Sequence, residues 1–271
     1  KAGGINVTAG ITTVQALQAT SGTFSADSTV NSINIGKGAN SIAGNTVLGE
    51  NALDAATTGQ NNVAIGKNAM TELTTSSGST AVGVDALKAL TTGNGNTALG
   101  KSTLAALVTG HSNVAIGDEA ATATLGNANV AIGDEALKTN TTGGNNVAIG
   151  NDALKLSTTS SNNTAVGAET LASNTTGGQN VAVGKDALQQ NTTGDNNTAV
   201  GSYALDSNTT ANNNTAVGHD ALATNATGTR NTAVGAYALD ANTTGSDNNA
   251  FGESALGANT TGGDNCAFGR L

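Results

Sequence analysis

Few side chains of this sequence could carry reaction chemistry, and they do not recur together. The two histidines, His111 and His219, fall at different points of the sequence pattern, and Cys266 is the single cysteine. A catalytic nucleophile needs a base at a fixed place beside it, and no such partner repeats with these residues. We therefore predict no catalytic residue, no cofactor and no enzyme activity. The histidines are expected at the solvent-exposed surface, and Cys266 is expected to be buried as a small apolar side chain.

Acidic residues gather in one part of the pattern, where they could bind cations through their oxygens. They include Asp118, Glu119, Asp134, Glu135, Asp152, Asp186 and Asp220. The same part of the pattern also holds Lys67, Lys101, Tyr203 and Tyr237. Because the carboxylates do not form a regular row of ligands, no metal site is predicted.

Asn-x-Thr triplets match the pattern that accepts N-linked glycans. The asparagines considered are Asn140, Asn174, Asn191, Asn208, Asn225, Asn242 and Asn259. Asn and Thr are also turn-forming residues that a repeat copies, so we favour a structural role for them. Paired threonines raise the alternative of an ice-binding surface. Neighbouring residues of a strand point to opposite sides, however, so a Thr-Thr pair does not give a flat array of two rows.

The composition excludes several classes of protein. The chain has 271 residues, of which only 2% are aromatic, with 37 Gly and no Pro or Trp. An ordinary globular core of this size is built around large apolar side chains, which are scarce here. Charged residues make up 11% of the chain and the net charge is -9, so neither a charge-rich disordered tail nor a nucleic-acid-binding surface is predicted. No apolar run approaches about 18 residues, so no membrane insertion is predicted.

An internal repeat decides the expected architecture. The motif Asn-Thr/Val-Ala-Val/Ile-Gly recurs with a period of seventeen from Gly49 to Gly269, and the single shorter step, from Gly117 to Gly133, lacks one residue. A small residue and then Leu follow most motif glycines, and Thr-Thr-Gly closes most units. Branched and small residues alternate within the motif, which predicts a short strand. The Asn, Thr and Gly of each unit break helices, so a helical repeat is excluded.

The repeat predicts an all-β protein, a parallel β-solenoid of about 13 to 14 coils over residues 36–271, with one repeat in each coil, preceded by a spacer segment at residues 1–35. The Ala-Leu stretch is expected to be a second short extended segment in each coil. Branched, leucine and aromatic side chains are expected to form the core ladder inside the coils. This ladder comprises Val63, Ile65, Leu87, Ile149, Leu154, Val183, Leu188, Val200, Leu205, Leu222, Leu239, Phe251 and Phe268.

The opposite face of each predicted strand carries Ala and the motif glycine, which allow close approach of two backbones. The close-packing glycines are Gly66, Gly83, Gly100, Gly117, Gly150, Gly184, Gly201, Gly218 and Gly235. Two alternatives are open for this face. It fills a narrow interior, or it packs against neighbouring copies around a threefold axis. The thin apolar core favours the second alternative, and with it a homotrimer.

Two irregularities carry their own expectations. In residues 118–133, Ala121 stands where other units have Leu, so we expect Leu125 to turn inward and the coil to be locally weak. In the last two motifs the fourth residue is Phe251 and then Phe268. These rings are expected to be largely buried as an apolar plug, and residues 245–271 are expected to border another domain or a processing site.

Several copies of the motif resemble a known family. Asn61-Asn62-Val63-Ala64-Ile65-Gly66 and Asn145-Asn146-Val147-Ala148-Ile149-Gly150 are similar to the head repeats of trimeric autotransporter adhesins. That resemblance implies a left-handed parallel β-roll in each chain and three rolls in one head. The coil here is longer, and with its Ala-Leu and Asn-Thr-Thr-Gly segments it resembles repeats of bacteriophage tail fibres, notably those of cyanophages. Residues 10–25 resemble the small-residue spacers of such fibres.

The resemblance implies a structural and adhesive role. The expected protein is a segment of a homotrimeric viral tail fibre, located in the virion, that extends or presents a host-recognition tip. Its partners would be its own copies, other tail proteins and, through an adjacent tip, a host surface receptor. The alternative is the head of a bacterial adhesin, extracellular on the cell surface, that binds host matrix or cells. An ice-binding solenoid is a minor alternative. A polysaccharide-degrading enzyme is disfavoured, because the two Tyr and three Phe do not cluster in the sequence as a platform for sugars.

Overall fold

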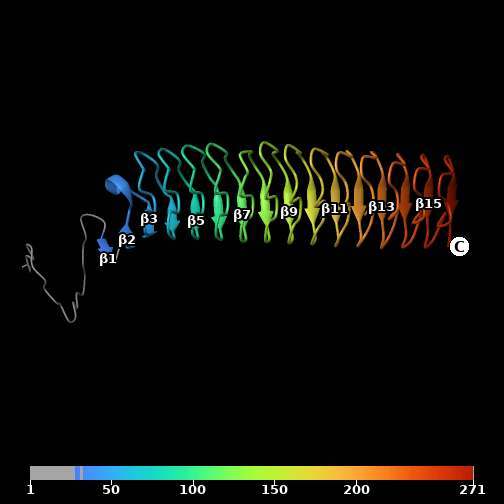
Figure 1. The fold of residues 1–271 in the computed structure, drawn as a ribbon, viewed down its shortest axis with the longest axis horizontal. Helices are drawn as coiled ribbons and strands as arrows, with labels where there is room; N and C mark the ends of the chain where they lie inside the picture. Colours follow the sequence, from blue (N-terminus) through green and yellow to red (C-terminus); the bar gives the residue numbers. More distant parts are fainter. Residues whose placement is uncertain (1–27, 31–32, 271) are drawn as a thin grey trace, which may run out of the picture.

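One sheet runs through the described part of the chain. The computed structural model describes residues 28–30 and 33–270, so most of the expected spacer at residues 1–35 lies outside the described residues. Sixteen strands lie side by side in sequence order and give a long rod (Figure 1). The first strands, β1 (Ser28–Val30), β2 (Ile33–Gly36) and β3 (Thr46–Gly49), pair antiparallel, and a short 3-10 helix, η1 (Ala39–Ser41), lies between β2 and β3.

From β3 onward all neighbouring strands are parallel, and each strand is the centre of one sequence motif. These strands are β4 (Val63–Ile65), β5 (Thr80–Val82), β6 (Thr97–Leu99), β7 (Val114–Ile116), β8 (Val130–Ile132), β9 (Val147–Ile149), β10 (Thr164–Val166), β11 (Val181–Val183), β12 (Thr198–Val200), β13 (Thr215–Val217), β14 (Thr232–Val234), β15 (Asn249–Phe251) and β16 (Cys266–Phe268). Equivalent residues pair one coil apart, as Ala165 does with Ala182. The predicted all-β parallel solenoid, with about 13 turns and roughly 17-residue coils, is confirmed. Its left-handed winding stays a prediction of the resemblance.

A common numbering makes the coils comparable. Position 1 is the residue after a motif glycine, and position 17 is the next motif glycine, so that residues 185–201 are one coil. The interior of this coil holds Ala187, Leu188, Asn191, Asn197 and Ala199, which are all fully buried. The leucines of the expected core ladder lie at position 4 and are likewise buried: Leu87, Leu154, Leu188, Leu205, Leu222 and Leu239.

Each strand directs to the interior the face that was predicted to point outward, so the β-branched and aromatic part of the expected core ladder is wrong. The central Ala of each motif points inward. Val183 is 37% exposed, Val200 is 38% exposed and Phe268 is 75% exposed. The others, Val63, Ile65, Ile149 and Phe251, are partly exposed on the same outer side. The interior already holds Leu at position 4 and Asn at position 13, which leave room for only a methyl group behind the strand. The small-residue face therefore fills a narrow interior and does not meet neighbouring copies.

The Ala-Leu stretch is a turn rather than the expected extended segment. Leu188 has a φ of 52°, in the left-handed region, and Asp186, two residues earlier, has a φ of 57°. A left-handed conformation costs an L-residue about 1–2 kcal/mol. Complete burial of Leu contributes about 1.5–3 kcal/mol, which offsets that cost. Asn and Asp tolerate this conformation best, which explains why they recur at position 2 without any need for a cation.

The motif glycines form a column in which successive backbones nearly touch, as the sequence predicts. Gly184 has a φ of 135°, and a Cβ built on it would lie 2.5 Å from the carbonyl oxygen of Gly201. No side chain fits there, so substitution would push adjacent coils apart.

The irregular coil at residues 118–133 does not compensate as expected. Leu125 is 45% exposed, and Thr124 occupies the interior with a hydroxyl that has no hydrogen-bond partner. The missing residue belongs to the turn after Leu125, so the residues before it keep the directions they have in every other coil. The strands keep their register, because Val114 still pairs with Val130.

Candidate functional site

The outer side of the sheet is the most extensive candidate for an interaction. We call the side chains at positions 14 and 16 of β3 to β16 the strand face. Position 16 carries only apolar residues: Leu48, Ile65, Val82, Leu99, Ile116, Ile132, Ile149, Val166, Val183, Val200, Val217, Val234, Phe251 and Phe268. Position 14 carries Val or Thr until Asn249 and Cys266. Neither row contains a charged residue.

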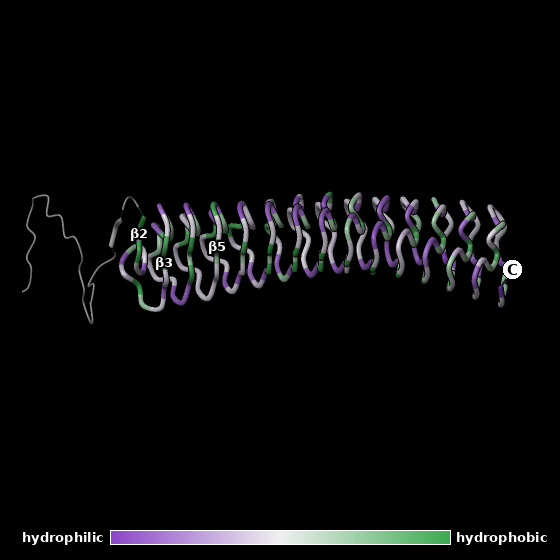
Figure 2. Tube along the Cα trace, turned by 90° about the horizontal axis from the view of Figure 1, so that it is seen from below, coloured by the Kyte–Doolittle hydropathy of each residue, from purple (hydrophilic) through white to green (hydrophobic). Residues whose placement is uncertain are grey.

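The strand face is uncharged, apolar throughout its position-16 row, and open to solvent in the single chain. Leu99 is 46% exposed and Val181 is 39% exposed. Hydrophobic segments recur in every coil along the rod (Figure 2). Soluble monomers rarely expose one continuous apolar surface of this extent, and such surfaces mark sites of association. This is the property that a surface for side-by-side packing requires.

The C-terminal end of the strand face differs from the sequence-based expectation. The Phe251 and Phe268 rings stack with their centroids 4.8 Å apart and nearly parallel, but they lie outside the coil rather than in a buried plug. Cys266 is exposed as well, so the prediction that it replaces a buried apolar residue is wrong. Both errors have one cause, because positions 14 and 16 point outward.

Charged side chains lie on the turn that follows the strands, and several of them form a network. Lys138 lies 2.7 Å from Glu119 and 2.6 Å from Glu135, and Lys155 lies 2.5 Å from Glu135 and 3.2 Å from Asp152. Hydrogen bonds from Lys138 and Lys155 lower the pKa of Glu135 to about 2. The network joins three consecutive coils on the surface. In the described part of the chain, no group of three His, Cys, Asp or Glu side chains could hold a metal ion.

The asparagines of the Asn-x-Thr triplets lie inside the rod. Asn191 is fully buried, and its Nδ2 donates hydrogen bonds to Asn174 Oδ1, at 2.8 Å, and to the Gly194 carbonyl, at 3.0 Å. Equivalent bonds link the later copies, of which Asn259 alone is partly exposed. A buried amide with both groups bonded cannot accept a glycan in the folded chain, so these residues have the structural role that we favoured.

In most coils only the second of the paired threonines is exposed. Thr192 Oγ1 donates to the Thr209 carbonyl at 2.9 Å, and this bond recurs between several coils. Thr193, the second member of the pair, faces solvent. The first hydroxyl is therefore used to join coils, and the pair offers no flat two-row array to ice.

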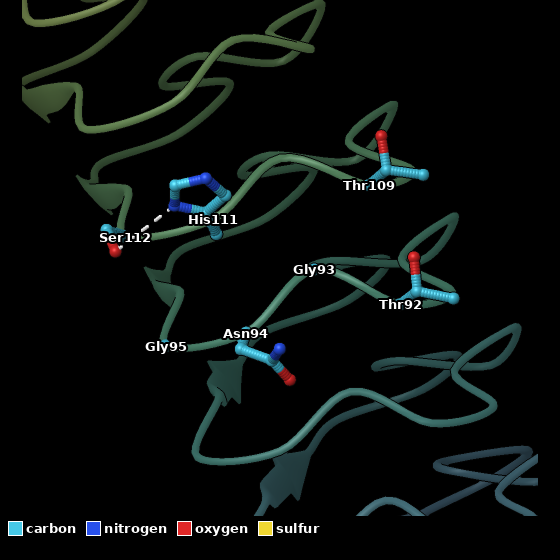
Figure 3. Close-up of a pocket in the computed structure, with 7 residues that line it drawn as sticks. All are labelled: Thr92, Gly93, Asn94, Gly95, Thr109, His111 and Ser112. Carbon is cyan, nitrogen blue, oxygen red and sulfur yellow. Dashed lines mark hydrogen bonds between the residues drawn. The ribbon is translucent and has the colours of Figure 1, made fainter.

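His111 lines a pocket of about 390 Å³ beside the irregular coil (Figure 3). The lining consists of Thr92, Gly93, Asn94, Gly95, Thr109, His111 and Ser112. His111 Nδ1 lies 3.5 Å from Ser112 Oγ, at the limit for a hydrogen bond, and it is exposed, as predicted. The two residues are neighbours in the sequence, and the contact lacks the short distance and the third orienting group of an activated nucleophile.

The structure brings together residues that the sequence analysis treated as scattered. Tyr203, His219 and Tyr237 lie in three consecutive coils and their rings contact one another. The prediction that His219 is exposed is confirmed, since its side chain is 50% exposed. The signal for the cluster was present in the sequence, because the two tyrosines occupy the same position of the repeat, two coils apart.

No protein-family model, no curated protein and no solved structure matches the chain. No helix in the described part of the chain is long and apolar enough to cross a membrane.

Proposed function

We propose that this chain is a shaft segment of a fibre, in which copies pack side by side through the strand face around a threefold axis. The observation that carries the proposal is the uncharged strand face along the whole rod, with its unbroken apolar row at position 16. Burial of apolar surface contributes about 25 cal/mol per Å², so even a modest area per coil becomes large over many coils. A threefold arrangement gives every copy the same contacts, as closed symmetry requires.

The shape of the chain suits a mechanical role. Each coil contacts only its neighbours, so a solenoid carries its ends apart over a length set by the number of coils. At about 4.8 Å per coil, 13 coils extend roughly 60 Å. Such a segment would hold a recognition tip away from the particle that bears it.

The resemblance supplies the biological setting. The longer coil, with its Ala-Leu and Asn-Thr-Thr-Gly segments, favours a tail fibre of a virion that contacts other tail proteins and, through a tip, a host surface receptor. The second setting is a bacterial surface adhesin head, extracellular, that itself binds matrix or cells. Both settings need the same association of copies.

Light scattering after size-exclusion chromatography tests the assembly. We expect a mass of about three times 26.1 kDa. Val183→Lys with Val200→Lys places two charges on the strand face and should release monomers, since a buried unpaired charge costs several kcal/mol. The matched control is Thr176→Lys with Thr193→Lys, on the exposed turn of the same two coils, which should stay trimeric. A stable wild-type monomer, or dissociation of both variants alike, would contradict the proposal.

A further inference from the structure

The two tyrosines of the chain lie against one of its two histidines at the surface of the rod. Tyr203, His219 and Tyr237 follow the carboxyl ends of β12, β13 and β14. The ring centroids of Tyr203 and His219 are 6.0 Å apart, and those of His219 and Tyr237 are 5.5 Å apart, with the rings edge to face. Lys185, one coil earlier, places its Nζ 5.5 Å from the Tyr203 centroid. These four residues, which we call the aromatic strip, form a continuous row along the rod.

Stability does not explain why tyrosine occupies position 2. Tyr203 has a φ of 60° and Tyr237 a φ of 58°, in the left-handed region that bulky residues rarely enter. That conformation is unfavourable for an L-residue, and Asn or Asp, which tolerate it better, occupy position 2 in several other coils, such as Asn68. The buried leucines offset the same cost by complete burial, whereas Tyr237 is 43% exposed. Tyr203 is partly buried, so neither tyrosine is completely buried in return, and a bulky residue held in an unfavourable conformation in this way indicates a functional site.

Carboxylates border the aromatic strip. Asp186 and Asp220 lie at position 2 of the coils on either side of Tyr203, and Asp206 follows Tyr203 in the same coil. Burial, and then the charges of Asp186 and Asp220, raise the pKa of Asp206, whose Oδ1 has no hydrogen-bond donor. Three carboxylates against the single ammonium of Lys185 repel anionic ligands. Asp186 is buried, but the Asp220 side chain is 28% exposed, with its Oδ2 2.9 Å from His219 Nδ1, and it offers a hydrogen-bond acceptor to a ligand that is rich in hydroxyl groups.

We propose that the aromatic strip binds an uncharged oligosaccharide laid along the rod. The C–H faces of sugar rings pack on the flat faces of aromatic side chains, and sugar hydroxyls donate to carboxylates. With coils about 4.8 Å apart, the three steps from Lys185 to Tyr237 span roughly 14 Å, which suits a short linear oligosaccharide. The strip lies beyond the ends of the strands rather than on the strand face, so this inference stands or falls separately from the fibre proposal.

Intrinsic fluorescence reports the strip directly, because the chain has no Trp and no other Tyr. The intact protein is titrated with neutral linear oligosaccharides of glucose, galactose and N-acetylglucosamine, with their sulfated forms, and with a basic Lys/Arg peptide. We expect a saturable change in tyrosine emission with at least one neutral sugar and none with its sulfated form. Silence with every neutral sugar overturns the proposal. A response to the sulfated forms or to the peptide alone also overturns it, in favour of an anion or cation site.

Substitution by asparagine separates binding from folding. Tyr203→Asn with Tyr237→Asn introduces the residue that other coils carry at position 2, so the melting temperature should be unchanged or higher. Calorimetric affinity for the neutral sugar should fall at least tenfold. The control, Asp85→Asn at the same position far from the strip, should leave affinity unchanged. If the double variant binds as tightly as the wild type, or if it melts well below the wild type, the rings are not a binding site and the proposal is wrong.

Discussion

The two halves of the rod share one fold but fill the same interior position with opposite chemistry. At position 7 the coils over residues 67–117 bury Leu73, Leu90 and Leu107. The coils over residues 168–269 place asparagines there, from Asn174 to Asn259. We call these the leucine region and the asparagine region. A change of this kind in an ordinary core would be severe, and here the backbone path is the same on both sides.

The asparagine region tolerates polar side chains inside because each amide has a partner in a neighbouring coil. Asn208 Nδ2 donates to Asn191 Oδ1 at 2.9 Å and to the Ala211 carbonyl at 3.1 Å, and Asn208 Oδ1 accepts from Asn225 Nδ2 at 3.2 Å. A satisfied buried hydrogen bond contributes about 1 kcal/mol, while an unsatisfied one costs about 1–3 kcal/mol. A ladder of amides is therefore stable only as a ladder, whereas a leucine is stable beside any apolar neighbour.

The two regions meet at residues 118–167, where neither chemistry is complete. Position 7 holds Thr124, Asn140 and Ser157 in successive coils, and the Thr124 hydroxyl has no partner. The coil that is one residue short lies here as well. On the surface, the ion-pair network that contains Glu135 spans the same coils. We call this segment the junction and expect it to open first.

Among exchanges of leucine and asparagine at position 7, replacing a leucine of the leucine region should reduce the free energy of unfolding most. Leu90→Asn removes a buried leucine and places an amide between Leu73 and Leu107, so no side chain of a neighbouring coil can pair with it. We expect the free energy of unfolding to fall by about 3–5 kcal/mol. Urea denaturation measures the change, with Thr92→Asn, on the exposed turn of the same coil, as the control. Equal stabilities for the two variants would show that position 7 is not a core position.

The leucines at position 4 are common to both regions, so their loss should not distinguish them. Leu87→Ala and Leu188→Ala should each lower the free energy of unfolding by about 2–4 kcal/mol. Gln189→Ala, on the surface beside Leu188, should change it by less than about 0.5 kcal/mol. If the leucine and glutamine variants have the same stability in denaturation, the alignment of coil positions is wrong.

The reverse exchange, Asn208→Leu, should cost less than Leu90→Asn. It leaves Asn191 Oδ1 without a donor, which costs about 1–3 kcal/mol, but it buries a leucine in return, so we expect a net loss of about 1–2 kcal/mol. Replacing every position-7 asparagine of the region by leucine should cost far less than the sum of the single changes, because no amide is then left unpaired. If the full replacement lowers the free energy of unfolding by as much as the sum of the single substitutions, the ladder of paired amides is contradicted.

The junction offers a change that should stabilise the protein. Thr124→Val removes the unpaired hydroxyl without altering the shape of the side chain, and we expect a gain of about 1 kcal/mol. Hydrogen exchange should show less protection at residues 118–133 than at residues 184–218 in the wild type, and a smaller difference in the variant. Uniform protection across both segments of the wild type would mean that the irregular coil is not weak.

The smallest expected effect concerns pH at the junction. The pKa of Glu135 falls from its ordinary value of 4.5 to about 2 in the folded chain. Its ion pairs therefore stabilise the fold fully above pH 4.5, and this contribution is lost as the pH falls toward 2. Hydrogen-exchange protection at the junction, relative to the intrinsic exchange rate at each pH, should fall across this range in low salt and less in high salt, since the pairs are partly exposed. Glu135→Gln should remove the difference, and an unchanged pH profile in that variant would assign the effect elsewhere.

Periodicity in the sequence was sufficient to predict the parallel solenoid, its coil length and the buried leucines. It could not decide which face of the strand points inward. Val183 and Ala182 alternate in either orientation, and the usual rule that branched residues are buried fails when the interior is too narrow for them. The turn at Leu188 was missed because its left-handed backbone is stable only through tertiary burial. The aromatic strip was not predicted, because its residues are far apart in the sequence although the stacking of the coils brings their side chains together.

The glycine column has a consequence for how such a chain changes over evolutionary time. Because the backbone of each motif glycine, such as Gly184, packs against the glycine of the next coil, every coil presents the same docking edge to its successor. Duplication or deletion of one whole repeat in the gene would therefore lengthen or shorten the rod by one step, with no compensating mutation required elsewhere. The one residue that the repeats have lost is missing from a turn, in the coil at residues 118–133. The length of the rod can thus change by whole coils, while the surface residues of each coil evolve separately.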